Sequence, residues 1–293
     1  MSIGHSPIVR RRRFGAELHA LREQARLTAV ELGAKLGWSE SKVSRLENAR
    51  VRPNVGDVMD LLDVLGVTDA TKREQLIALA RDAATTRGWW SAYDGDIDKR
   101  QIMSAELENG AVQIREFQPM LVPGLLQCRE YAYARFASRS MLGLPLINVD
   151  AAVDARLARQ DILTRDAPLE YQALLDEALL VRRCGPPGAR RAQLAHLVKL
   201  AELPAVTLRV LPYDAEIEGH YIPPCGFALF RFADPVDPEL ITLETETSDL
   251  HLGDEEDLDR YKASYDQMWQ AAFSPEDSVS LLTAARDDQE EEP

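Results

Sequence analysis

The chain has 293 residues, of which 45% are hydrophobic, so it is long enough to form two domains with buried cores. Its formal net charge of -14 and its pI of about 4.9, taken alone, argue against a nucleic-acid-binding protein. The charge is uneven, because residues 1–90 carry 15 Lys and Arg against 11 Asp and Glu, a net of +4, whereas the remainder carries 19 against 37, a net of -18. This asymmetry predicts a basic part joined to an acidic body that repels DNA.

The first residues, MSIGHSPIVRRRR, contain no apolar run after their charges. They resemble neither a secretory signal nor a membrane span, and we expect a cytoplasmic protein. The four arginines at 10–13 open a helix whose apolar stripe is Phe14, Leu18 and Leu21. Two interpretations of the arginines stay open: a solvated helix start and an arm that contacts DNA phosphates.

Residues 28–48 predict two short helices joined by a glycine turn. In the first helix, Val30, Leu32 and Leu36 have the apolar spacing of a buried face. Gly33 is small enough to let a second helix cross close by, and Gly37 ends the helix.

The second helix of the pair begins after Ser39, a predicted N-cap, and buries Val43 and Leu46. Its remaining side chains face outward and can hydrogen-bond base edges or phosphates. They are Glu40, Ser41, Lys42, Ser44 and Arg45. Asn54 is expected to cap a fourth helix that Gly66 ends, and a fifth helix is predicted at 70–86, leading into the next domain or pairing with a second subunit.

Residues 21–67 resemble, without a gap, the phage-repressor type of helix-turn-helix DNA-binding domain. Such domains place the second helix of the pair in the major groove. By matching positions, the resemblance implies base reading by Ser39, Glu40, Ser41, Lys42 and Arg45, and phosphate contacts from Thr28, Ala29, Asn48, Arg50 and Arg52. It also implies an ion pair between Arg22 and Glu47 that serves folding. Two departures from the pattern are a bulky Trp38 in the turn and Ala29, whose phosphate contact would come from its backbone N–H.

From Gly88 the composition changes to an aromatic and then acidic segment, GWWSAYDGDID. We predict a helix-turn-helix domain at 1–87, a linker at 88–100, a mixed α/β domain at 101–286 and an acidic disordered tail at 287–293. Trp89 and Trp90 are expected to pack at a domain interface in preference to forming a ligand platform, because large aromatic side chains mostly bury area.

Helical and strand patterns alternate in the second domain. Helices are expected at 101–110, from a turn at Pro123 and Gly124 to about 140, at 150–163, at 189–202 and at 255–273, before an apolar piece at 279–285. Strands are expected at 112–117, 169–175, 205–211, 225–232 and 239–246. The fold class is therefore α+β, with an all-α five-helix domain followed by a mixed α/β domain that has one small sheet.

Several short motifs in the body occur in order and at consistent spacing. They are GWW at 88–90, VPGLLQ at 122–127 with Tyr131 and Ala132, ARLARQDIL at 155–163, LLDEALLVRR at 174–183, QLAHL at 193–197, VLP at 210–212 and GFALFRF at 226–232. Together they resemble the body of the WhiJ-like, antitoxin-like helix-turn-helix regulators of actinomycetes. The resemblance implies a transcriptional regulator encoded beside a small acidic partner protein, and it assigns no biochemical role to the body.

Residue patterns that would indicate catalysis or a cofactor are sparse. Cys128, Cys184 and Cys225 are odd in number and far apart, and the five histidines have no metal-binding spacing. Carboxylates flank the strands at 169–175 and 239–246, but exposed strand edges explain them equally well. We expect no cofactor, no metal and no enzymatic activity.

Two binding hypotheses remain for the body. In the first, it docks a small protein through the PGLLQ segment and a sheet edge at 226–232. In the second, it binds a small-molecule effector in a pocket lined by Trp89, Trp90, Arg156, Arg159 and Tyr221. A closed pocket lined by those residues would favour the effector, whereas an exposed apolar patch would favour the protein partner.

For the DNA interface, we expect a homodimer that presents residues 39–48 of each copy to two half-sites of a palindromic operator in double-stranded DNA. Arg45 is the residue that we expect to make a bidentate contact with guanine. Lys42 and Arg50 should mainly set phosphate affinity, and Glu40 either accepts from cytosine or complements the helix N-terminus.

Overall fold

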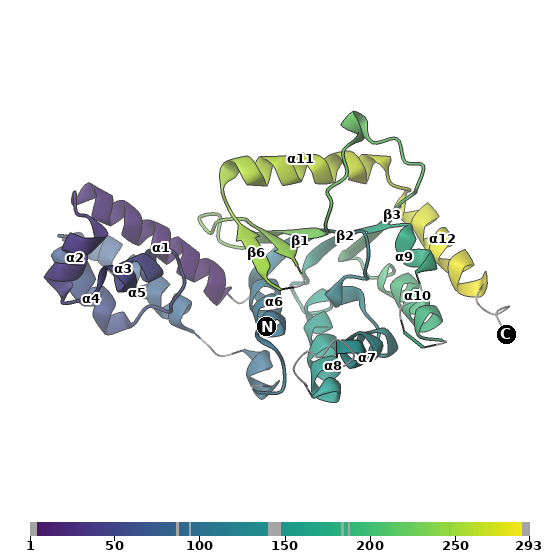
Figure 1. The fold of residues 1–293 in the computed structure, drawn as a ribbon, viewed down its shortest axis with the longest axis horizontal. Helices are drawn as coiled ribbons and strands as arrows, with labels where there is room; N and C mark the ends of the chain where they lie inside the picture. The colour runs from purple at the N-terminus through teal and green to yellow at the C-terminus, as the bar shows by residue number, and fades with distance from the viewer. Residues whose placement is uncertain are drawn as a thin grey trace. The chain divides into compact units, whose positions relative to one another are not determined.

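The computed structural model describes residues 5–85, 88–93, 95–139, 148–182, 185–186, 188–245 and 247–288. It forms two compact units, of which the first holds the residues up to Ser91 and the segment Ala233–Pro238. The second unit holds Ala92–Phe232 and the residues from Glu239 onward (Figure 1). The change from one unit to the other falls inside the predicted linker, and each unit is described by itself.

The first unit contains the five predicted helices, and a side chain caps the first turn of each. The helices are α1 (Pro7–Gln24), α2 (Ala29–Leu36), α3 (Glu40–Glu47), α4 (Val55–Val64) and α5 (Ala70–Ala84). The capping residues, whose side-chain oxygens accept from backbone N–H groups, are Ser6, Thr28, Ser39, Asn54 and Asp69. The predicted caps Ser39 and Asn54 are therefore confirmed, while residue 86, the predicted end of the fifth helix, lies outside the described residues.

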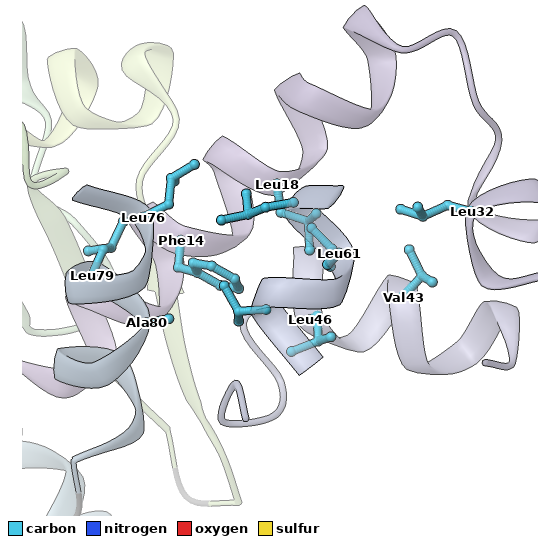
Figure 2. Close-up of a cluster of buried hydrophobic side chains, with 11 residues drawn as sticks. Phe14, Leu18, Leu32, Val43, Leu46, Leu61, Leu76, Leu79 and Ala80 are labelled. Carbon is cyan, nitrogen blue, oxygen red and sulfur yellow. The ribbon is translucent and has the colours of Figure 1, made fainter. Parts of the chain in front are cut away.

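The core of the first unit gathers one apolar face from each helix. Figure 2 shows Phe14 and Leu18 of α1 directed toward Leu46 and Leu61, and the same cluster includes Leu32. The prediction that Val30 belongs to this face is wrong, because its side chain is 57% exposed. Val30 lies two residues before Leu32, and this separation places it on another side of the helix.

Glycines allow α1, α2 and α3 to approach closely. A Cβ added at Gly15 of α1 would lie 2.3 Å from the carbonyl oxygen of Glu47, and one at Gly33 would lie 2.9 Å from that of Trp38. Gly37, at the end of α2, adopts the left-handed conformation with φ of 68°. The predicted roles of Gly33 and Gly37 are confirmed, and Gly15 fixes how α1 meets the end of α3.

The arginine run at the start of α1 is partly neutralised within the first unit. Cations are unfavourable near a helix N-terminus, because the first-turn N–H groups carry partial positive charge. Arg10 is buried and lies 3.1 Å from Asp234, while Arg13 donates to Asp234 at 2.7 Å and to Asp237 at 3.2 Å. These two arginines are therefore not a solvated helix start.

The second unit is built on a six-stranded mixed sheet with the order β3-β2-β1-β4-β5-β6. β1 pairs in parallel with β2, which pairs in parallel with β3, whereas β4, β5 and β6 continue as antiparallel neighbours. The strands are β1 (Ala111–Gln118), β2 (Glu170–Asp176), β3 (Val206–Leu211), β4 (Phe227–Phe232), β5 (Leu240–Glu244) and β6 (Asp249–Leu252). The α+β fold class is confirmed.

Helices cover both faces of this sheet. Figure 1 shows α11 on one face and α6, α7, α8 and α10 on the other. The α-helices of this unit in the described residues are α6 (Lys99–Gly110), α7 (Arg129–Ala137), α8 (Val149–Ala158), α9 (Ala178–Val181), α10 (Ala189–Leu200), α11 (Glu255–Ala271) and α12 (Pro275–Asp287). A core under α11 includes Phe117, Phe227, Ile241, Tyr265 and Met268.

The structure differs from the expected elements at several points. The piece at 279–285 is part of a full helix, α12, and Asp287, the expected start of the disordered tail, is its last residue; residues 289–293 lie outside the described part. The helix expected at 150–163 becomes 3-10 in its last turn, η4 (Arg159–Leu163). The strand β6 was not predicted, because four residues give too short an alternation.

The expected sheet edge at 226–232 is wrong. β4 lies between β1 and β5, so its backbone N–H and C=O groups are already paired on both sides. The PGLLQ segment is also unsuited to docking, since it forms the short helix η2 (Gly124–Leu126), in which Leu125 and Leu126 are buried. Neither predicted docking element presents a free surface.

Candidate functional site

The outer face of α3 is the main candidate site of the first unit. Ser39 accepts a hydrogen bond from the backbone N–H of Lys42 at 3.2 Å and so fixes the start of the helix. Val43 and Leu46 are buried and attach α3 to the core. The residues with exposed side chains are Glu40, Ser41, Ser44 and Arg45. Within the described residues, the carboxylate of Glu40 and the guanidinium of Arg45 make no hydrogen bond or ion pair with another side chain. The residues predicted to read bases are therefore accessible to a ligand.

Lys42 differs from its neighbours on α3, because its ammonium group already has partners. Its Nζ lies 2.6 Å from Asp57 of α4 and 3.7 Å from the centre of the Trp38 ring. Both contacts favour a lysine that lies against its own domain. The bulky Trp38 in the turn therefore has a role that was not predicted from the sequence. Together with Asp57 it forms a clamp on the ammonium group of Lys42.

Removing this clamp should strengthen phosphate contacts. In Asp57→Asn, we expect Lys42 to be released toward DNA, so non-specific affinity should rise and the dependence of log K on log salt should steepen by about 0.9. Fluorescence anisotropy with random duplex DNA over a salt series measures both. Asp60→Asn, on the exposed side of the same helix, removes an equal charge and is the matched control. Equal slopes for the two variants would contradict the clamp.

The residues predicted to contact phosphate at helix ends also have local partners. The Thr28 hydroxyl accepts from the backbone N–H of Glu31 at 3.2 Å, and the Glu31 carboxylate accepts from the backbone N–H of Thr28 at 2.8 Å. The hydrogen bonds that the backbone N–H and the hydroxyl of Thr28 donate to this carboxylate lower the pKa of Glu31. Asn48 donates to the carbonyl of Ser44 at 2.8 Å, and so closes the last turn of α3. The two hydrogen bonds from the backbone N–H groups of Thr28 and Glu31 form a capping box, and the Thr-x-x-Glu spacing in the sequence is typical of this motif.

The remaining DNA-binding candidates lie around the two helices. Ala29 is half-buried and packs against the core, while the side chains of Arg50 and Arg52 are exposed after α3. Arg50 follows Ala49, which has φ of 56°, so the chain turns sharply at the end of α3. The turn brings this basic segment directly after α3.

The predicted pair of Arg22 and Glu47 joins α1 to the end of α3. Arg22 Nε donates to Glu47 at 2.6 Å and Nη2 donates to the other carboxylate oxygen at 3.1 Å. Both side chains are 9% exposed. His19 adds a contact to Glu47 at 3.0 Å, and Arg22 also donates to the carbonyl of Leu27 at 2.8 Å. Although burial opposes ionisation, these hydrogen bonds lower the pKa of Glu47.

The five residues predicted to line an effector pocket are not all brought together. Trp89 and Trp90 belong to the first unit and meet edge to face, with ring centres 5.9 Å apart. Tyr221 belongs to the second unit, where its side chain is 53% exposed. Within the second unit, Arg156 and Arg159 lie together, on α8 and the helical turn that follows it.

Arg159 forms a buried ion pair with Glu108 of α6. Its Nε donates to one carboxylate oxygen at 2.8 Å and its Nη2 donates to the other. The two side chains are 6% and 7% exposed. Burial alone would lower the pKa of Arg159, but the adjacent Glu108 carboxylate reverses the direction and raises it. The guanidinium of Arg159 and the carboxylate of Glu108 are thus each other's ion-pair partner.

Arg156 lies beside this pair without a carboxylate of its own among the described residues. It donates to the side-chain oxygen of Gln127 at 2.8 Å and stacks on Phe136, with its guanidinium carbon 4.9 Å from the ring centre. Burial and the charge of Arg159 lower its pKa to about 10. Gly124 leaves room for these groups, since a Cβ there would lie 3.2 Å from both guanidinium groups.

A second, half-buried carboxylate lies on the same face of the sheet. Glu116 of β1 accepts from the Tyr171 hydroxyl at 2.5 Å and from Gln118 at 2.9 Å. Burial raises the pKa of Glu116 to about 7. Neither Glu108 nor Glu116 was identified from the sequence, because their partners lie 51 and 55 residues away.

No metal site or membrane span accompanies these groups in the part of the chain that the structure describes. Over these residues, His, Cys, Asp and Glu side chains do not gather in threes as they would around a metal ion. None of the described helices is both long enough and apolar enough to cross a bilayer. Cys128 and Cys225 are free thiols, and burial raises the pKa of Cys128 to about 11; Cys184 lies outside the described residues.

Residues 13–76 match a family model described as a helix-turn-helix domain. This match, together with the exposed face of α3, shows that the chain contains a helix-turn-helix domain. A domain of this class implies DNA binding. Residues 103–284, more than half of the chain, match the family described as Domain of unknown function (DUF5753). The chain therefore belongs to the DUF5753 family. Searches of curated proteins and of solved structures find no match.

Proposed function

We propose that this protein is a sequence-specific transcriptional regulator that binds a palindromic operator in double-stranded DNA as a homodimer. The observation that carries the proposal is the division of α3 into a buried side, Val43 and Leu46, and an exposed side able to read bases. Two copies of α3, held by a dimer about one helical turn apart, would enter successive major grooves. The acidic composition of the body supports specific binding, since it weakens the non-specific term.

We further propose that the second unit binds a small acidic partner protein and is not an enzyme, as the resemblance to WhiJ-like, antitoxin-like regulators implies. Support comes from the distribution of polar groups in this unit. Arg159 is paired with Glu108, and Tyr171 donates to Glu116, so these groups have structural partners within the unit. A small-molecule effector pocket remains the second candidate, resting on Arg156 and its unpaired charge.

Arg45 is the side chain on which we expect base specificity to depend most. Replacing Arg45 by alanine removes a predicted bidentate contact with guanine, which is worth about 1–3 kcal/mol, or about 5- to 150-fold in affinity for the operator. Binding to random DNA should weaken much less. Arg50→Ala is the control, because a phosphate contact contributes equally to all sequences. If Arg45→Ala weakened operator and random DNA equally, the assignment of Arg45 to base reading would be wrong.

The experiment that tests the whole proposal is selection of bound duplexes from a random pool by the purified full chain. It is carried out with and without the product of a neighbouring small gene, if one is encoded there. We expect enrichment of a palindromic motif, with half-sites separated by about one helical turn, and a change in enrichment when the partner is added. Absence of any enriched motif in both conditions would refute the regulator model, and a non-palindromic motif would refute the homodimer.

A further inference from the structure

The second unit has an apolar groove where the parallel strands β1 and β2 end. Met120 and Val122 follow β1, and Leu179 and Leu180 lie on α9, which follows β2. The third side is formed by α10, which Figure 1 shows beside α9. The residues that line it are Met120, Val122, Tyr131, Leu179, Leu180, Arg182, Arg190, Gln193, Leu194 and Leu197. In open sheets with parallel strands, ligands commonly bind outside the carboxyl ends of the strands.

The groove is too shallow to enclose a small molecule. The space that it encloses is about 10 Å³, hardly that of one water molecule, whereas small-molecule pockets measure about 300–1,000 Å³. The lining residue Met120 is 49% exposed, and Val181, which lies between the lining residues Leu180 and Arg182 at the end of α9, is 60% exposed. Large apolar side chains exposed next to an apolar groove are typical of a protein-binding surface.

The floor of the groove is held by satisfied polar groups. Gln193 accepts from the backbone N–H of Cys128 at 2.9 Å and donates to the carbonyl of Leu126 at 2.7 Å. The hydroxyl of Tyr131 accepts from the backbone N–H of Val122 at 3.3 Å. Since these hydrogen bonds fix the walls before anything binds, a partner would lose little free energy in ordering them.

Two arginines at the rim are left without carboxylate partners among the described residues. Arg182 donates only to the sulfur of Met120, at 3.5 Å, and the Nε of Arg190 is buried without a hydrogen-bond acceptor. The carboxylates nearest to these arginines in the sequence, and the one on α7, already accept hydrogen bonds from other groups. Asp176 accepts from the backbone N–H of Ala178, Glu177 accepts from that of Tyr213, and Glu130 is held at the start of its own helix.

We propose that this groove docks an amphipathic segment of a second protein whose apolar side chains are flanked by carboxylates. The proposal rests on the proposed function, in which the second unit binds a partner, and it names the surface and the chemistry of that partner. Apolar side chains of the partner would pack on Met120 and Val181 at the mouth of the groove, and the flanking carboxylates would pair with Arg182 and Arg190. A second copy of this chain, docking through the same face, would instead bring the same two arginines together.

The test uses three synthetic helical peptides and the full chain. The first peptide has leucines at i, i+3, i+4 and i+7 flanked by glutamates, the second has lysines in place of the glutamates, and the third has serines in place of the leucines. Fluorescence anisotropy measures binding over a salt series. We expect only the first peptide to bind, with affinity that falls as salt rises.

Variants of the protein locate the site. Arg190→Glu and Val181→Lys should each weaken binding of the first peptide by about tenfold or more. Arg260→Glu, which changes an exposed arginine of α11, and Val236→Lys, which changes another side chain that is 61% exposed, should leave it unchanged. Thermal unfolding of each variant verifies that the fold is retained. Because Val181 is exposed, its substitution tests the groove even if Arg190→Glu proves unstable.

The outcomes separate this proposal from the proposed function. Binding of all peptides alike, binding unaffected by Arg190→Glu and Val181→Lys, or no binding would overturn the groove assignment, while DNA selection by the same preparation would still test the regulator. Self-association that Val181→Lys abolishes, measured by analytical ultracentrifugation, would instead identify a second copy as the occupant and overturn the proposal. Peptide binding by a chain that selects no DNA motif would leave the groove assignment intact and refute the regulator.

Discussion

Arg159→Met is expected to lower the free energy of unfolding of the second unit by about 3–5 kcal/mol. The substitution conserves much of the apolar volume but leaves the Glu108 carboxylate buried without its partner, and a lone buried charge is far more costly than a buried pair. Peptide-resolved hydrogen exchange is the appropriate measurement, because two units need not unfold in one step. We expect faster exchange in α6, β1 and β2, with the first unit unchanged.

The double variant Arg159→Met with Glu108→Leu is the control for Arg159→Met. If the loss arises from an uncompensated charge, removing the second charge should recover most of the stability, since apolar replacements of buried pairs are often neutral or stabilising. A loss in the double variant as large as the sum of the two single losses would contradict this explanation. It would show that packing, and not charge pairing, determines the effect.

Glu47→Gln should destabilise the first unit by on the order of 3 kcal/mol, because it leaves the Arg22 guanidinium without its carboxylate. The pKa of Glu47 is lowered in the folded state, so the ionised carboxylate stabilises the fold at pH values above its unfolded pKa of about 4.3. That contribution is lost as the pH falls through the folded pKa. The difference in stability between the two proteins should therefore be largest near neutral pH and shrink in acid.

Hydrogen exchange of α1 and α3, measured from neutral to acidic pH, tests the pH dependence. Glu40→Gln is the matched control, since Glu40 lies on the same helix with an exposed side chain and should change the free energy of unfolding little. A stability difference between wild type and Glu47→Gln that stays constant or grows in acid would contradict the role of the ionised carboxylate.

The helix-turn-helix domain could be predicted closely because its signals are local. Capping side chains, a glycine turn and apolar spacing act over a few residues, and these gave Ser39, Gly37 and Asn54 their roles. The pair of Arg22 and Glu47 was predicted through a resemblance and is confirmed by the structure. The contacts of Lys42 were missed, since the choice between DNA and Asp57 depends on side-chain directions that spacing does not reveal.

The second unit was harder to predict because its decisive contacts are distant in the sequence. Strand positions follow from local alternation, but the order β3-β2-β1-β4-β5-β6 does not, and β4 was therefore assigned to an edge wrongly. Glu108 was not singled out from the sequence, because its partner Arg159 lies 51 residues away. Arg156 and Arg159 were predicted from the sequence as effector candidates, which stays a prediction; the contact of Arg159 with Glu108 was not predicted.

The way α3 is fastened has a consequence for how such regulators diverge. Gly15, Glu47 and the buried side of α3 hold the helix by contacts that involve none of its four exposed side chains. Those four positions can therefore be exchanged as a set while the scaffold is retained. Under the proposed function, a library randomised there should yield orthogonal regulators, each with its own operator, from a single backbone.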